Sequence, residues 1–177
     1  QKQREEGKLQ KKYLALAEGD LSEANDSVFW KEIAIPLAPD PENSMKMTIS
    51  PDGLLPGSRN AVTYYKNIKN FGNATLVELQ LETGRTHQIR VHMAGIGHPL
   101  LGDTMYNPRA CLKMSNRKEK KNTEGRINNR NDCFKRAALH AWKLTFCHPF
   151  TDEIITLEAP LPDDFCRFLN ANEEEKT

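Results

Sequence analysis

The densest group of chemically capable side chains lies in the stretch L-E-T-G-R-T-H-Q-I-R-V-H, residues 81–92. Alternating apolar residues predict a strand over 75–82, and Thr86 suits the N-cap of a helix that begins directly after it. Free backbone N–H groups point outward at such a junction, so it favours anions. Its arginines add paired N–H donors for phosphate or carboxylate. Five side chains are expected to crowd there: Arg85, Thr86, His87, Gln88 and Arg90. The alternative is a solvated helix start with surface arginines.

Metal chemistry is not indicated by this cluster. His87 and His92 are five residues apart, so on a helix they face different sides. The chain has no H-E-x-x-H pattern, and its four cysteines form no C-x-x-C pair. Phosphate-loop, dinucleotide-binding and serine-hydrolase motifs are also missing. We therefore predict neither a metal nor an organic cofactor.

The basic residues are concentrated in one segment. The whole chain carries a net charge of only +1, yet residues 107–136 hold ten lysines and arginines against three acidic residues. Such a segment is either a solvated loop or a polyanion-binding surface. No apolar run is long enough to cross a membrane, and no secretory signal is visible. The cysteines are expected to be free thiols inside the cell, in the cytoplasm or an organelle.

The elements that must position these residues alternate in hydrophobicity at strand spacing. Strands are predicted at 13–17, 29–37, 61–65, 75–82, 139–146 and 153–159, with Pro36 placing the second at a sheet edge. Residues 1–12 are expected to be a charged lead-in or a helix end, and 39–56 a loop with one short strand at 45–49. Ile89, Met93 and Ile96 form one helical stripe, and Pro162 begins a final helix. The prediction is an α+β fold: one domain over 1–177, a mostly antiparallel mixed sheet with flanking helices and long loops, and 107–136 as an insertion.

Four blocks of this sequence resemble the RluA-like family of RNA pseudouridine synthases. The main block is L-E-T-G-R-T-H-Q-I-R-V-H-M-A-G-I-G-H-P-L-L-G-D, residues 81–103. K-K-Y-L-A-L at 11–16 is similar to the family's K-x-Y-L-A element, and 61–65 to its A-x-T-x-Y strand. A-L-H-A-W at 138–142, with H-P at 148–149 and E-A-P-L-P at 158–162, is similar to its closing hairpin. The blocks follow the family's order over nearly the whole chain.

The resemblance implies isomerisation of uridine to pseudouridine in rRNA or tRNA, without a cofactor, on the family's catalytic fold. It implies that Tyr13 is the active-site tyrosine, which packs on the flipped base. It implies that Arg90 pairs with the nucleophilic aspartate, and that Leu139 lines the base pocket beside Arg85, Thr86, His87 and Gln88. RNA phosphates are then the expected partners of six basic residues: Lys11, Lys12, Arg109, Lys118, Lys120 and Lys121.

One family element is missing from these residues. The family's nucleophile lies in a H-R-L-D-x-x-T-S-G element ahead of the K-x-Y block, and the chain has no such element. We therefore interpret the chain as the C-terminal part of a catalytic domain whose N-terminal part is its expected partner, and as inactive by itself. An unpaired buried charge is destabilising, so Arg90 is expected to be solvated or bound to an anion.

Two other readings stay open. The chain could be a non-catalytic RNA-binding module, in which Tyr13 and Arg90 have lost their chemistry. It could also be an unrelated enzyme that uses Arg85, His87 and Arg90 on a phosphorylated metabolite.

Overall fold

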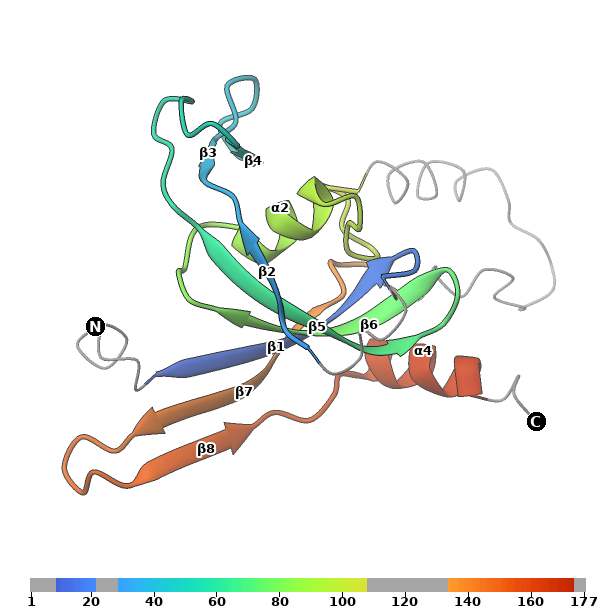
Figure 1. Cartoon of the computed structure of the whole chain (residues 1–177). Coiled ribbons are helices and arrows are strands. Elements are labelled where there is room, and N and C mark those ends of the chain that lie inside the picture. The colour runs from blue at the N-terminus through green and yellow to red at the C-terminus, as the bar shows by residue number, and fades with distance from the viewer. Residues whose placement is uncertain (1–8, 22–28, 108–133, 174–177) are drawn as a thin grey trace, which may run out of the picture.

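The fold is built on one antiparallel sheet of six strands (Figure 1). The structure is a computed structural model that describes residues 9–21, 29–107 and 134–173. The strand order is β2-β5-β6-β1-β7-β8, and every strand pairing in these residues is antiparallel. The strands are β1 Gln10–Glu18, β2 Lys31–Ala34, β5 Val62–Asn70, β6 Ala74–Leu81, β7 Leu139–Cys147 and β8 Ile154–Glu158. Together with two helices, this confirms the α+β class.

β1 is the central strand and contributes to both faces of the sheet. Its alternation sends Ala15 and Ala17 into one hydrophobic cluster and Leu14 and Leu16 into another. It pairs with β6 on one side and with β7 on the other, and its register with β7 shifts between Lys12 and Tyr13. The strand begins at Gln10, so the expected lead-in over 1–12 is wrong for 10–12, where pairing to β6 and β7 extends the strand.

The edge position predicted for the second strand is confirmed, but the strand is short. Among the described strands β2 pairs only with β5, and it ends at Ala34, two residues before Pro36. The chain then forms a small separate sheet from β3, Leu37–Pro39, and β4, Met47–Ile49. The short strand predicted within the loop over 39–56 is therefore present as β4, and its partner β3 ends at Pro39, where that loop was expected to begin. Figure 1 shows this small sheet rising on the same side of the main sheet as helix α2.

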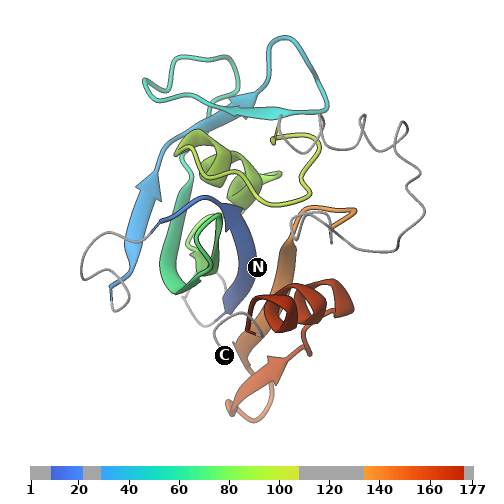
Figure 2. The ribbon, with the colours of Figure 1, turned by 90° about the vertical axis from the view of Figure 1, so that its right-hand side faces the viewer.

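Two helices cover opposite faces of the sheet (Figures 1 and 2). α2, Gln88–Gly95, packs Ile89 and Met93 against the cluster that contains Ala15 and Ala17. α4, Asp163–Glu173, begins directly after Pro162, where the final helix was predicted, and buries Phe165 and Phe168 fully against Leu14 and Leu16. Neither helix of the described residues has the length and apolar character needed to cross a membrane.

Candidate functional site

The start of α2 differs from the sequence prediction. The N-cap is His87, in the left-handed conformation with φ 56°, and not Thr86. The helix start has no side-chain cap hydrogen bond, and the buried Gln88 side chain instead binds the turn before it: its Oε1 accepts the backbone N–H of Arg85 at 2.9 Å and the Thr83 hydroxyl at 2.9 Å. Its Nε2 donates to the Val62 carbonyl at 2.9 Å and to the Thr63 hydroxyl at 3.0 Å. Gln88 therefore fastens the helix start to β5.

His92 anchors the same helix one turn later. It is fully buried, with Nδ1 2.9 Å from the Thr63 hydroxyl and Nε2 2.8 Å from the Ile35 carbonyl. Burial lowers the pKa of His92, and the hydrogen bond to Ile35 opposes that shift only in part. Within the described residues no group of three or more His, Cys, Asp or Glu is arranged to hold a metal.

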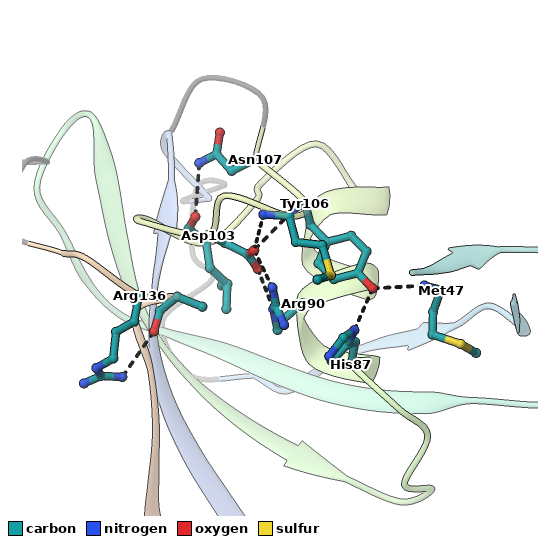
Figure 3. Close-up of polar contacts among 10 residues, drawn as sticks. Met47, His87, Arg90, Asp103, Tyr106, Asn107 and Arg136 are labelled. Carbon is teal, nitrogen blue, oxygen red and sulfur yellow. Dashed lines mark hydrogen bonds and ion pairs between the residues drawn. The ribbon is translucent and has the colours of Figure 1, made fainter. Parts of the chain in front are cut away.

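Arg90 is held by an aspartate of its own chain (Figure 3). Its Nε donates to Oδ2 of Asp103 at 2.7 Å, and its Nη2 to Oδ1 at 2.6 Å. The Asp103 side chain is fully buried, while the Arg90 side chain is 21% exposed. This hydrogen bonding raises the pKa of Arg90. The expectation of a solvated or anion-bound Arg90 is therefore wrong, because Asp103 supplies a bidentate partner that the sequence reasoning missed.

Asp103 is also the acceptor for its own turn. Oδ1 accepts the backbone N–H groups of Met105 at 3.0 Å and Tyr106 at 3.2 Å. Both carboxylate oxygens are therefore occupied by N–H donors. One signal in the sequence could have identified this residue: a Gly-Asp pair ends the block that contains Arg90, and Asp next to Gly is typical of a turn.

Tyr106 connects Arg90 to the small sheet. Its ring centroid lies 4.9 Å from Cζ of Arg90, within cation–π distance. Its hydroxyl accepts the backbone N–H of Met47 at 3.0 Å and lies 2.8 Å from Nδ1 of His87 (Figure 3). Burial, and then the charge of Arg90, lower the pKa of His87, which favours a neutral imidazole. The tyrosine hydroxyl can therefore give its own hydrogen to His87.

Tyr13 lies on β1, and its side chain is half-buried. Its side chain borders two cavities, one of about 310 Å³ toward β5 and β6 and one of about 330 Å³ toward β7 and β8. Tyr13 and Leu139 both pack against the cluster that contains Ile89 and Met93 of α2. The structure thus brings Tyr13, Leu139 and the helix that carries Arg90 to one side of the sheet.

The remaining predicted site residues are distributed more widely. Arg85 is bound through Nε to the Asn60 carbonyl at 3.0 Å, and Thr86 is exposed. Lys11 is exposed and borders both cavities, whereas Lys12 forms a 2.8 Å ion pair with Glu78 on β6. The other four predicted RNA-binding residues lie outside the described residues: Arg109, Lys118, Lys120 and Lys121.

Comparison with known proteins identifies the family to which the sequence is similar. The sequence model of the family described as RNA pseudouridylate synthase matches residues 1–95. Ribosomal large subunit pseudouridine synthase D of Haemophilus influenzae is 40% identical over 164 residues, which cover 93% of this chain and 45% of that protein. The protein of the same name from Vibrio cholerae is 46% identical over 129 residues, 73% of this chain and 36% of that protein.

A solved structure shares the fold. Human RNA pseudouridylate synthase domain containing 4 superimposes with a TM-score of 0.68 at 25% identity, over 97% of this chain and 64% of the human chain. This chain spans less than half the length of the two bacterial relatives. Because the family model covers more than half of the 177 residues and the fold agrees, the chain belongs to the RNA pseudouridylate synthase family.

Proposed function

We propose that the intact natural protein containing this chain isomerises uridine to pseudouridine in RNA. The observation that carries the proposal is the position of Tyr13, which lies on the central strand, between two cavities, on the sheet side covered by the Arg90 helix. The names of the two bacterial relatives make RNA of the large ribosomal subunit the first substrate to test. Structured RNA in general, tRNA included, is the wider substrate class.

The reaction demands three things that these residues support. The base must leave its stack, which costs a few kcal/mol and is offset by stacking on an aromatic ring, here Tyr13. The N-glycosidic bond breaks, C1′ joins C5 of the base, and N1 takes up a proton from water as the C5 proton leaves. The Tyr13 hydroxyl is the proposed acceptor of the C5 proton, and it passes its own proton on to water. A nucleophilic carboxylate must stay ionised, which an adjacent guanidinium favours. Arg90 is the proposed guanidinium, and Leu139, Arg85 and Thr86 are the proposed lining of the base pocket.

Asp103 is not suited to be that nucleophile. Its two oxygens accept four N–H donors, two from Arg90 and two from its own turn, and the side chain is fully buried. The family's nucleophile element is absent from the 177 residues. The 177-residue chain by itself is therefore expected to bind RNA without isomerising it.

Lys11 and the basic segment 107–136 are the proposed contacts to RNA phosphates. Lys11 is exposed at both cavities, and the described ends of the segment lie beside Asp103: Asn107 donates to the Asp103 carbonyl at 2.8 Å. Each phosphate contact makes RNA affinity fall more steeply with salt. Deletion of residues 113–130 should reduce that salt slope, and an unchanged slope would remove the segment from the interface.

The test uses a large-subunit rRNA fragment carrying tritium at C5 of uridine. Because C5 becomes bonded to C1′, pseudouridine formation releases that tritium into water. The intact natural protein should release tritium and leave pseudouridine in the RNA, whereas the 177-residue chain should bind without release. An intact protein that binds the RNA but releases nothing would contradict the proposal and favour a non-catalytic RNA-binding module.

A further inference from the structure

Arg90 is restrained along one edge and across one face. Asp103 takes up the Nε and Nη2 edge of the guanidinium, and the Tyr106 ring lies 4.9 Å from its Cζ. Nη1 makes no hydrogen bond within the described residues, and the side chain is 21% exposed. Because Asp103 and Tyr106 restrain the rest of the guanidinium, its Nη1 end is the part that another group can bind.

The carboxylate that holds Arg90 is itself fixed by the backbone. Asp103 follows Gly102, whose φ of +68° favours glycine. A Cβ on Gly102 would lie 2.6 Å from Cβ of Phe134 and would collide with the Arg136 carbonyl. The turn is therefore packed directly against the chain that leads into β7, and Asn107 closes it through its amide donation to the Leu100 carbonyl at 3.0 Å.

Tyr106 is fixed at its far end. The Met47 N–H donates to its hydroxyl at 3.0 Å, and the His87 imidazole lies 2.8 Å away. The His87 and Tyr106 rings also meet edge to face, with centroids 5.6 Å apart. Contacts at the hydroxyl thus orient the ring that lies against Arg90.

We propose that Asp103 and Tyr106 are positioning residues that hold the Arg90 guanidinium in a fixed orientation for the reaction. The proposal rests on the proposed function of the site. Arginine differs from lysine in presenting N–H groups in a rigid plane, so its usefulness to a reacting carboxylate depends on how that plane is held. A displacement of about 1 Å in such a group lowers a rate by about 100-fold.

The first test is Asp103→Asn in the intact natural protein. The amide keeps an oxygen for the turn but places an NH₂ group against an N–H of Arg90. The single-turnover rate of tritium release should fall by about 100-fold, while the Kd for RNA should change by less than about threefold. The matched control is Asp164→Asn, which removes a 3.0 Å pair with Arg136 at the start of α4 and should leave the rate unchanged.

A spectroscopic readout separates orientation from general damage. In protein labelled with ¹⁵N-arginine, the Nε–H resonance of Arg90 is identified by its loss in Arg90→Lys. Asp103→Asn should shift this resonance and speed its exchange with water, and Asp164→Asn should do neither. An active wild type whose rate and Arg90 resonance are both unchanged by Asp103→Asn would overturn the positioning proposal. An inactive wild type would instead overturn the proposed function.

A second pair of variants decides the question if Asp103→Asn does not fold. Tyr106→Phe keeps the ring against Arg90 and loses only the links to His87 and Met47, whereas Tyr106→Leu loses the ring as well. The rate should fall by about threefold in the first and about thirtyfold in the second. Equal rates for the two variants would overturn the role of the ring.

Discussion

Two buried carboxylates of this fold hold cations in different ways. Asp103 is fully buried and binds one arginine along one edge, with the Tyr106 ring against the guanidinium. Glu78, 6% exposed, binds two lysines: Lys12 at 2.8 Å and Lys66 at 3.0 Å. The Trp30 ring faces both ammonium groups, with its centroid 5.7 Å from Nζ of Lys12 and 5.1 Å from Nζ of Lys66.

The difference lies in what each carboxylate leaves available. Glu78 lies on β6, between β1 and β5, and its lysines come from those two neighbours. Burial alone would raise the pKa of Glu78, but the lysines outweigh that effect and lower it. The cluster therefore fastens three strands together with compact cations. Asp103 instead orients a planar cation whose other end stays available. We infer that the Glu78 cluster serves stability and that the Asp103 cluster serves the reaction.

The largest effect is expected at Tyr13, beside the Arg90 helix. Tyr13→Phe keeps the ring for stacking but removes the hydroxyl proposed to accept the C5 proton. The single-turnover rate of tritium release should fall by about 1000-fold, in the range typical of general acid–base groups. RNA affinity, measured by filter binding, should stay unchanged. A Tyr13→Phe protein with the wild-type rate would remove Tyr13 from the chemistry.

The turn that carries Asp103 should be the part of the fold most sensitive to a single methyl group. Gly102→Ala should lower the free energy of unfolding by about 3 kcal/mol, because positive φ and a steric collision act together. The matched control is Gly53→Ala, which has a φ of +71° but no atom within 4 Å of the added methyl. It should cost only about 1 kcal/mol. Equal losses in urea unfolding would contradict the packing described for the Gly102 turn.

Glu78→Gln tests the stabilising half of the comparison. It should lower the free energy of unfolding by about 1–2 kcal/mol, because a buried acceptor loses its charge beside two lysines. Glu158→Gln breaks a 3.1 Å pair with Lys143 at the surface and should leave the stability unchanged. The rate of tritium release by Glu78→Gln should match the wild type at a temperature where both are folded, and a large loss would give this cluster a role in the reaction.

The smallest effect is expected in the pH dependence of stability. Burial lowers the pKa of His92 in the folded state, so the folded chain binds fewer protons than the unfolded one. This contribution is fully present above the ordinary pKa of 6.5 and is lost as pH falls through the folded value. His92→Asn should therefore flatten the fall of the unfolding free energy below pH 6.5. Parallel curves for the wild type and His92→Asn would contradict this role of His92.

The sheet was readable from the sequence because its signals are local. Alternation predicted β6 and the closing β7–β8 hairpin, Pro36 predicted the edge position of β2, and Pro162 predicted the start of α4. The first residues of β1 were missed because their polar and charged side chains show no alternation. They are in the strand because they pair with β6 and β7.

The network around Arg90 was less accessible because it depends on contacts across the fold. Arg90 and Asp103 are thirteen positions apart, on a helix and on a turn, and nothing in the spacing shows that they meet. The His87 N-cap was missed because its left-handed conformation is uncommon outside glycine. Tyr13 was singled out only through the family resemblance, whereas Arg90 was already part of the polar cluster at 81–92. The roles of both residues in the reaction stay predictions.

The most direct measurement compares Arg90→Lys with Lys66→Arg in single-turnover tritium release from rRNA. Both substitutions keep the positive charge: the first replaces a guanidinium by an ammonium group, and the second does the reverse. We expect Arg90→Lys to lower the rate by about 100-fold, because lysine has no planar fork for Asp103 to orient. Lys66→Arg should keep the wild-type rate, because Glu78 needs only a nearby positive charge. Full activity in Arg90→Lys, or an equal loss in Lys66→Arg, would contradict the distinction between the two clusters.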